Sequence, residues 1–400
     1  MTLSRTPGVE ARFALFYFCL FSVFAAVTPY FQVLLRAQGF SKSSIGFIFG
    51  VLETIGLLAP PLWGWISDHS RHRRSLLAFI ILASGATFLL FGWIADFWLA
   101  AGAALLFGFF YRPIIPLTDG FVLRYLSEHG GDYGRPRAAG SVAFIATVSL
   151  MELAGVARGT NQAAIILSAV AGCSLVHALC VAALPLTATE VAEREGRIER
   201  PQRHFEWAIF RSAPFVVFTL ISFMGRFAMM SYYSFFSLYL REAVGFQEVG
   251  WLWALGPLAE IPVIFFSGRI IRRIGVRNLF ALGIAGIALR LIGYSLAPSV
   301  WAIIPLQFLH ALTFGAYHTS SLYYINRLVP SHMKQSATSI FASISLGVSA
   351  IVSSAVGGVV IDHFGFRAMY ASYGALAVVA FALIFLVLKP VEAPGSAEKP

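Results

Sequence analysis

Charged residues are scarce in this sequence. Only 12% of its 400 residues are Asp, Glu, Lys or Arg, whereas a soluble domain carries about 25%. Hydrophobic residues make up 58% of the chain, and the mean hydropathy is +0.76. Because no water-soluble fold can bury such a surplus of apolar side chains, the composition excludes a soluble protein and predicts an integral membrane protein.

Cysteines are few, and the motifs of enzymes are missing. Cys19, Cys173 and Cys180 lie in apolar stretches, at spacings that suit neither a disulfide framework nor a metal site, so we expect buried free thiols. The sequence contains no Gly-x-x-x-x-Gly-Lys-(Ser/Thr) motif, which excludes an ATP drive within this chain. It also contains no nucleophile–base grouping, so we expect neither an enzyme nor a cofactor or metal. The longest polar stretch, Thr189 to Glu206, is too short to be the output domain of a sensor.

Twelve apolar stretches are long enough to cross a membrane as helices, which takes about 20 residues each. The expected spans of this all-α integral membrane protein cover residues 13–35, 44–66, 75–95, 97–123, 138–157, 162–187, 211–240, 247–268, 278–297, 299–326, 336–361 and 367–388. A cytoplasmic linker at 189–207 separates an N-terminal six-helix bundle (1–188) from a C-terminal six-helix bundle (208–390). The tail at 391–400 is expected to be disordered.

The placement of Lys and Arg predicts the orientation. If both termini lie on one side, that side carries 21 Lys and Arg residues and the opposite side five. Cytoplasmic loops are enriched in these residues, so both termini and the linker are expected in the cytoplasm. This asymmetry also explains the pI near 9.7 without a nucleic-acid partner. The first apolar run lacks a small-residue cleavage site, so we interpret it as a retained helix.

A pair of glycines that ends in a basic turn occurs twice, 204 positions apart. Gly46 and Gly64 are separated by 18 positions, as are Gly250 and Gly268, and several arginines follow each pair. A repeat of this length predicts two similar halves.

The first basic turn resembles the signature Gly-x-x-x-Asp-(Arg/Lys)-x-Gly-(Arg/Lys)-(Arg/Lys) of the major facilitator superfamily. Gly64, Asp68 and Arg73 match it, Arg71 replaces its second glycine, and Gly268 opens the corresponding turn in the second half. The resemblance implies two six-helix bundles related by a pseudo-twofold axis along the membrane normal, which rock to give alternating access. Asp68 is an acid among basic residues at a helix end, which suggests a charge lock that holds the two halves in one state, so we assign Gly64, Asp68, Arg73 and Gly268 to gating. The alternative for the arginines is a topology signal alone.

Four further stretches resemble the phenylpropionate-permease branch of that superfamily, a relative of the lactose and nucleoside proton symporters. They are Pro113 to Asp119, Asp132 to Ser141, Gly250 to Glu260 and Leu309 to His318. This resemblance implies a multi-pass protein of the bacterial inner (plasma) membrane that imports a small organic solute with protons.

Three ionisable residues lie near mid-depth in the second half. Glu260, Arg290 and His318 are about ten residues from the cytoplasmic ends of their spans, which reaches the middle of the bilayer at a rise of 1.5 Å per residue. A charge there costs at least about 2.5–3.5 kcal/mol, so Glu260 and Arg290 are expected to pair. His310 lies two turns from His318 on a similar face, with Phe314 between them. The resemblance implies that Glu260, Arg290, His310 and His318 carry proton coupling. The alternative is a structural ion pair with histidines hydrogen-bonded between helices.

The first half has buried charges of its own. Glu53, Arg112 and Glu152 are also near mid-depth, and Arg112 with either acid could serve packing as readily as substrate binding. Asp119 lies seven residues after Arg112, in one of the family-like stretches, and is a candidate for binding. Its alternative role is an ion pair with Arg137, which we assign to the gate.

Arg226 is a third buried arginine, beside Tyr232 and Tyr233. Arginine suits planar, bidentate binding of carboxylates, and an aromatic lining suits a ring-bearing acid. The predicted substrate-binding set is therefore Arg112, Asp119, Arg226, Tyr232 and Tyr233. For the aromatic residues the alternative is core packing with an interfacial belt.

Together these features predict a proton-coupled importer of a small organic solute, an aromatic or other carboxylate of the phenylpropionate kind. The alternatives are a sugar or nucleoside proton symporter and a proton-driven exporter. The helix at 138–157 lacks the Gly-Pro-x-x-Gly-Gly pattern of drug–proton antiporters, which disfavours an exporter without eliminating it. The expected partners are the solute, protons and the lipid bilayer, and the expected state is a monomer.

Overall fold

The computed structural model of this chain describes residues 7–70, 72–129, 134–157, 161–182, 184, 212–329 and 334–388. Arg71, the predicted linker and the predicted tail lie outside the described residues. Every regular element within the described ranges is a helix, which confirms the all-α fold class. A helix is favoured in a bilayer because it satisfies its own backbone hydrogen bonds where no water is available.

Nine stretches of the described chain are long and apolar enough to cross a membrane. One of them, Ile340–Val387, covers two of the predicted spans. The predicted spans at 138–157 and 247–268 are helical but are not among the nine. The count of twelve spans therefore stays a prediction, while the nine apolar helices of spanning length agree with a multi-pass membrane protein.

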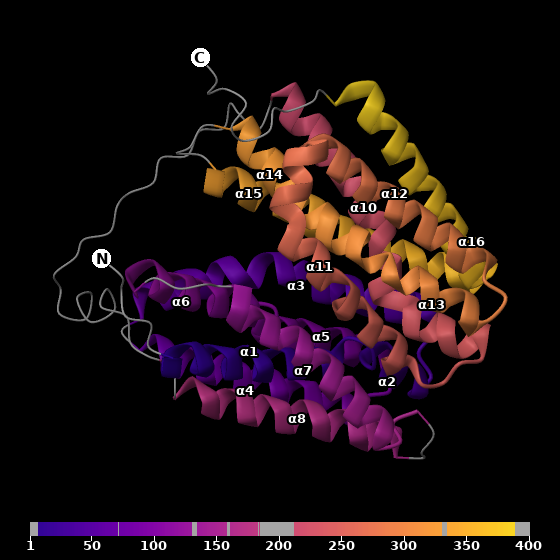
Figure 1. Cartoon of the computed structure of the whole chain (residues 1–400). Helices are drawn as coiled ribbons and strands as arrows, with labels where there is room; N and C mark the ends of the chain where they lie inside the picture. Colours follow the sequence, from indigo (N-terminus) through magenta and orange to yellow (C-terminus); the bar gives the residue numbers. More distant parts are fainter. Residues whose placement is uncertain are drawn as a thin grey trace. The chain divides into compact units, whose positions relative to one another are not determined.

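The first of two compact units comprises Met1–Phe40 and Val51–Arg203. Its helices are α1 (Pro7–Val27), α2 (Phe31–Ala37), most of α3 (Lys42–His69), α4 (Arg73–Leu89), η1 (Leu90–Gly92), α5 (Phe97–Tyr111), α6 (Ile114–His129), α7 (Gly134–Leu153) and α8 (Gln162–Val181). Helix α1 packs along α7 and α8, and α4 packs against α5 and α8 (Figure 1). Rings of Phe31, Phe88, Phe91 and Phe107, all buried, meet one another in the core of this unit.

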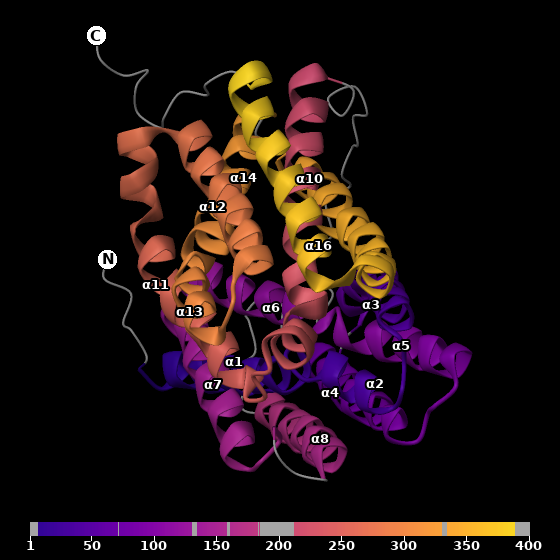
Figure 2. The same ribbon diagram turned by 90° about the vertical axis from the view of Figure 1, so that its right-hand side faces the viewer.

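The second unit comprises Ser41–Gly50 and His204–Pro400. Its elements are α10 (Ala213–Leu238), η3 (Tyr239–Val244), α11 (Val249–Ile274), α12 (Val276–Leu296), α13 (Val300–Phe308), η4 (Ala311–Ala316), α14 (Tyr317–Leu328), α15 (Lys334–Ala342), η6 (Ser343–Val348) and α16 (Ser349–Val387). Helices α10, α12 and α16 run side by side in Figure 2, and α16 packs against both of the others. The elements η3, η4 and η6 are π-helical, a geometry that is frequent at functional sites.

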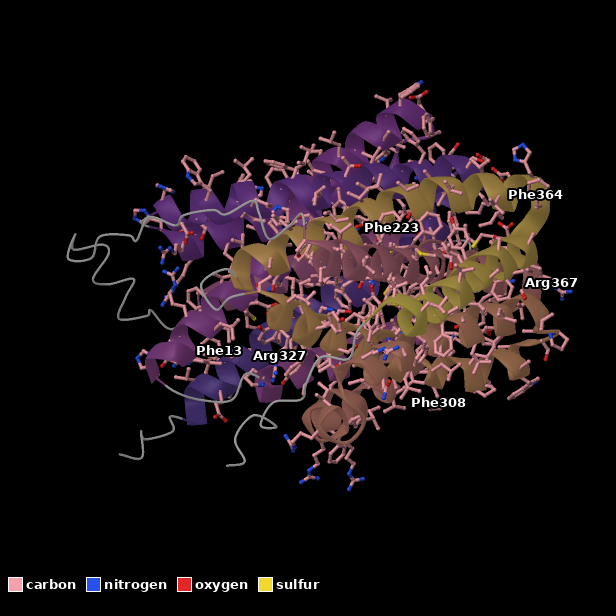
Figure 3. The ribbon with its side chains drawn as sticks, turned by 90° about the horizontal axis from the view of Figure 1, so that it is seen from above. Phe13, Phe223, Phe308, Arg327, Phe364 and Arg367 are labelled. Carbon is pink, nitrogen blue, oxygen red and sulfur yellow. The ribbon has the colours of Figure 1, made fainter. Side chains whose placement is uncertain are left out.

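Helix α16 contains a sharp bend. Gly365 has a φ of 82°, in the left-handed region that favours glycine, and this residue turns the chain back toward α12. Phe364 and Arg367 lie on the two sides of the bend (Figure 3). The bend separates the two spans that were predicted at 336–361 and 367–388.

The first turn of α3 is held by α16 within the second unit. Asp362 accepts hydrogen bonds from the Ser43 backbone N–H (2.7 Å), from the Ser43 hydroxyl (2.6 Å) and from the Lys42 backbone N–H (3.3 Å). The carboxylate thereby satisfies donors that the start of a helix leaves without an intrahelical partner. A side chain at Gly358 would collide with the backbone carbonyl of Lys42, so glycine is required for this close approach.

Candidate functional site

Arg290 is the centre of a polar cluster inside the second unit. It comes from α12, is 2% exposed, and its guanidinium donates hydrogen bonds to four neutral side chains. The acceptors are Tyr294 Oη at 2.7 Å, Gln307 Oε1 at 2.6 Å, His310 Nδ1 at 3.0 Å and Thr313 Oγ1 at 3.2 Å. These contacts come from α12, α13 and the start of η4, so one rigid, forked donor ties three elements together.

The contact with Arg290 also fixes the tautomer of His310. A guanidinium has no acceptor, so His310 Nδ1 must accept the bond and cannot carry a proton while the bond is formed. The proton of the neutral ring is then on Nε2, on the side of α11, where the ring packs against Gly256. A second proton can therefore reach His310 Nδ1 only after Arg290 withdraws. Protonation of His310 Nδ1 and this hydrogen bond are therefore mutually exclusive.

Aromatic rings support the Arg290 cluster from α10 and α11. The guanidinium carbon lies 4.0 Å from the ring centre of Tyr232, a geometry of cation–π attraction. Tyr232 packs in turn on Trp253, at 4.6 Å between ring centres, and on Phe236, at 4.7 Å. All three rings are buried. In this conformation Tyr232 therefore supports Arg290, and its predicted contact with a solute stays a prediction.

His310 and His318 belong to a column of three rings along η4 and α14. Phe314 lies 5.8 Å from His310 and 5.4 Å from His318 between ring centres, and the interplanar angles are 2° and 6°. Phe314 thus stands between the two histidines, as its position in the sequence predicted. A phenyl ring cannot pass a proton, so any transfer between the histidines would have to go around it.

Glu260 lies within α11, four residues after Gly256, the residue that contacts His310. The side chain of Glu260 lies outside the described part of the structure. Its predicted pairing with Arg290 therefore stays a prediction. The described acceptors of Arg290 are neutral, so the cluster itself carries the unit positive charge that a nearby carboxylate would balance.

Arg226 has a more open environment than Arg290. It lies in the middle of α10 and is half-buried. Its guanidinium carbon lies 5.3 Å from the ring centre of Tyr233, which is also half-buried. The Nε of Arg226 is buried and has no hydrogen-bond partner among the described residues. A buried donor without a partner is costly, so this group is suited to an acceptor that arrives with a ligand.

Arg112, by contrast, has an acidic partner. It follows α5 in the first unit, and its guanidinium forms a short ion pair with Glu53 of α3. Gly56, one turn further along α3, leaves room for the aliphatic part of the Arg112 side chain. Of the two acids considered from the sequence, Glu53 is the partner. The assignment of Arg112 to substrate binding stays a prediction, and the ion pair would have to open for it.

The other predicted acids of this unit contact tyrosines. Asp119 accepts a hydrogen bond of 2.6 Å from Tyr17 of α1, and the Arg137 guanidinium lies over the ring of Tyr17 at 5.9 Å. Tyr17 therefore links the two residues that the sequence suggested as an ion pair. Glu152 accepts a hydrogen bond of 2.9 Å from Tyr30. The first contact joins α1 to α6, and the second joins the start of α2 to α7. Both suit gating or packing.

Three of the predicted gating residues, Gly64, Asp68 and Arg73, lie where α3 ends and α4 begins. Arg73 donates to the Ser67 carbonyl oxygen (3.0 Å), which is one of the last carbonyls of the helix. Asp68 forms an ion pair of 3.6 Å with Arg124 of α6. Gly64 has open space around its Cα. In the second half Gly268 lies within α11, and its surroundings are outside the described side chains.

Sequence reasoning missed Gln307, Tyr294 and Thr313, which complete the Arg290 cluster. Gln307 had a signal: it is an amide in an otherwise apolar run, and a polar residue inside a membrane helix needs a partner. Tyr294 could also have been predicted, because it lies four residues after Arg290 and therefore on the same face of α12.

Comparisons with known proteins agree with this architecture. The model of the family described as MFS_1 like family matches residues 11–372. A maltose permease of Geobacillus stearothermophilus is 24% identical, covering 97% of this chain and 98% of its own. A probable 3-phenylpropionic acid transporter of Escherichia coli (strain K12) is 27% identical, covering 94% of this chain and 97% of its own.

A solved structure extends the agreement to the fold. The crystal structure of the nucleoside transporter NupG superimposes with a TM-score of 0.81 and covers 96% of this chain and all of its own. Its sequence identity is 16%, so the likeness concerns the fold alone.

Proposed function

Because this chain belongs to the MFS_1 like family of multi-pass membrane transporters, and is therefore not an enzyme, we propose that it imports a small organic acid together with protons. The observation that supports this proposal is the hydrogen bond between Arg290 and His310 Nδ1. His310 Nδ1 cannot carry a proton while it accepts this bond from the buried guanidinium. The proposed location is a bacterial inner membrane with both termini in the cytoplasm.

Coupling follows from the linkage between three groups. Protonation of His310 Nδ1 breaks its bond with Arg290, which frees a guanidinium N–H for another acceptor. Glu260 is the proposed acceptor. A carboxylate near the freed guanidinium stays ionised, whereas a carboxylate that has lost this partner takes up a proton. Glu260 is therefore also the proposed proton carrier. The solute and the proton would then be released together when the cluster relaxes. His318, on the other side of Phe314 from His310, would take part in the same proton transfer.

The substrate class is proposed from the three buried arginines. Arg290 donates to four neutral acceptors. The Nε atoms of Arg112 and Arg226 are both buried without a described hydrogen-bond partner. Arg112 is already ion-paired with Glu53, whereas no described acid is paired with the Arg226 guanidinium. An arriving carboxylate would satisfy the Arg226 donor with a charge-assisted bond. The ring of Tyr233 beside it suits an aromatic portion of the solute, and the 3-phenylpropionic acid relative supports an acid of that kind.

A sugar is the second candidate, favoured by the maltose permease at 24% identity. A neutral sugar would use the hydroxyl-rich and amide-rich parts of the site and would have no need of the Arg226 charge. The two candidates therefore differ in their dependence on Arg226.

Replacement of Glu260 tests the coupling. We expect Glu260→Gln to abolish accumulation of solute against a gradient, because the side chain can no longer exchange a proton, while exchange of labelled solute across the membrane continues. Uptake into energised vesicles and counterflow in de-energised vesicles measure the two activities separately. Glu10→Gln, in the first turn of α1, is the matched control and should leave both activities unchanged. Full proton-driven accumulation in Glu260→Gln would refute its role.

A further inference from the structure

The three cysteines of the chain are free thiols, and two of them meet inside the first unit. Cys19 of α1 and Cys180, in the last turn of α8, have their sulfur atoms 3.5 Å apart. The two residues are 161 positions apart in the sequence, so it is the packing of α1 along α8 that brings them together. The proposed transport function does not use this pair.

The two sulfur atoms are close enough to react with each other. They would have to approach by about 1.5 Å to reach the bond length of a disulfide, which is about 2.0 Å. Small rotations about the two Cα–Cβ bonds can supply this movement. Cys173 lies seven residues before Cys180, which is about 10 Å along α8. The chain therefore contains one pair of adjacent thiols and a third thiol that serves as a reference.

The pair can be reached from the lipid. Cys180 is half-buried, and the preceding turns of α8 expose Leu175, Val176 and Leu179. Apolar side chains that a membrane-spanning helix exposes face the hydrocarbon of the bilayer. Cys19 is buried behind Cys180. A reagent dissolved in the hydrocarbon would therefore meet Cys180 first.

His177 is a proton acceptor beside the pair. It lies three residues before Cys180, so the two side chains are neighbours on the surface of α8. Its ring packs against Phe16 of α1, at 4.7 Å between ring centres. The ring is fully buried, and neither of its nitrogens has a hydrogen-bond partner among the described residues. Since the thiolate and not the thiol is the nucleophile, a neighbouring imidazole can activate the sulfur of Cys180.

We propose that Cys19 and Cys180 form a redox-sensitive modification site, at which an organic hydroperoxide dissolved in the bilayer converts the thiol pair into a disulfide. His177 accepts the thiol proton of Cys180, and the sulfur attacks the terminal oxygen of the hydroperoxide. The O–O bond breaks, the alcohol leaves with the proton from His177, and Cys180 becomes a sulfenic acid. Cys19 then attacks this sulfur, which forms the S–S bond and releases water. In total, two thiols and one hydroperoxide give one disulfide, one alcohol and one water.

The disulfide would act within the first unit. It would join α1 to α8, which come from opposite ends of the sequence of this unit, and would close a loop of 161 positions. A crosslink across so long a loop strongly restricts the unfolded chain. Oxidation would therefore hold these two helices together.

Oxidation of the purified chain in proteoliposomes by cumene hydroperoxide tests the site. Free thiols are blocked with N-ethylmaleimide at intervals, and the unreduced digest is analysed by mass spectrometry. We expect two of the three thiols to be lost, a crosslinked peptide pair that contains Cys19 and Cys180, and Cys173 still labelled. The same concentration of hydrogen peroxide should react about tenfold more slowly, because its polar groups are costly to transfer out of water.

Single substitutions separate the roles of the residues. Cys173→Ala is the matched control and should form the same disulfide at the wild-type rate. Cys19→Ala should stop at the sulfenic acid of Cys180, which dimedone traps, and Cys180→Ala should leave Cys19 reduced. His177→Gln should slow the reaction about 100-fold, as expected when a general base is lost, but should reach the wild-type final yield. An unchanged rate, or a lower final yield, would assign His177 to packing instead.

Three results would overturn the proposal. Cys19 and Cys180 could both remain labelled after exhaustive treatment with cumene hydroperoxide, Cys173 could be oxidised as fast as the pair, or the crosslink could join two chains. Faster oxidation by hydrogen peroxide than by cumene hydroperoxide would exclude the route through the hydrocarbon. Because each cysteine is changed singly, one variant that fails to fold leaves the wild-type crosslink and the other variants as tests.

Discussion

Arg290→Gln should lower proton-driven uptake by at least about 100-fold. The shorter side chain cannot reach His310, Gln307 and Tyr294 together, and each buried polar group that loses its partner costs about 1–3 kcal/mol. Two such losses at the middle of this range total about 4 kcal/mol, which corresponds to a factor of more than 100 at about 1.4 kcal/mol per tenfold change. The initial rate of uptake, normalised to the amount of protein in the membrane, measures this effect.

Arg290→Lys should fail almost as severely, and this variant separates geometry from charge. Lysine keeps the positive charge but offers a single ammonium, which cannot replace a planar fork that reaches α12, α13 and η4 at once. The matched control is Arg272→Gln, which alters an exposed arginine of α11 and should transport normally. Melting temperatures of the purified variants distinguish lost transport from lost folding. Wild-type uptake by Arg290→Lys would show that charge alone suffices and that the forked network is incidental.

Arg226→Gln should raise the KM for a carboxylate solute about 10- to 100-fold, while neutral solutes should change about twofold or less. A hydrogen bond to a charged group contributes about 1.5–3 kcal/mol, which sets this range. The comparison uses 3-phenylpropionate and maltose as probes in the same vesicles. Because the Nε of Arg226 has no described hydrogen-bond partner, its loss should not lower the melting temperature.

Tyr233 provides the companion variants for Arg226. Tyr233→Phe keeps the ring beside the guanidinium and should bind 3-phenylpropionate as the wild type does. Tyr233→Ala removes the ring and should weaken binding of 3-phenylpropionate about three- to tenfold. This is the contribution expected of a cation–π contact that is partly exposed to solvent. An unchanged KM for 3-phenylpropionate in Arg226→Gln would exclude the carboxylate assignment. Saturable maltose uptake that Arg226→Gln leaves unchanged would favour the sugar.

The fold could be predicted from the sequence because a bilayer leaves few choices. Long apolar stretches must be helices there, and the repeated glycine pairs and basic turns indicated two similar halves. The sharp bend of α16 was predictable as well, since the polar pair Asp362 and His363 with Gly365 interrupts an apolar run. What composition could not predict is that the first turn of α3 groups with the second unit. That association depends on contacts of Asp362 and Gly358.

The depth of the candidate site residues in the membrane could be predicted from the sequence, but which of their side chains touch could not. Counting residues from the helix ends placed Arg290 and His318 near mid-depth, and the spacing of His310, Phe314 and His318 predicted one face. Which groups touch depends on the rotation of each helix about its axis, and the π-helical turn η4 changes that rotation locally. Sequence reasoning therefore paired Arg290 with an acid and did not foresee its bonds to Gln307 and Tyr294.

The most direct test of proton-coupled import is proton flux in proteoliposomes that contain the purified chain. External pH is followed without an imposed gradient while 3-phenylpropionate, maltose or a nucleoside is added, one at a time. If protons enter with a carboxylate solute, addition of 3-phenylpropionate or a similar acid makes the external medium more alkaline, and Glu260→Gln abolishes the signal. Equilibration of labelled 3-phenylpropionate with no change in external pH would identify a facilitator and contradict the coupling role of Glu260, Arg290 and His310.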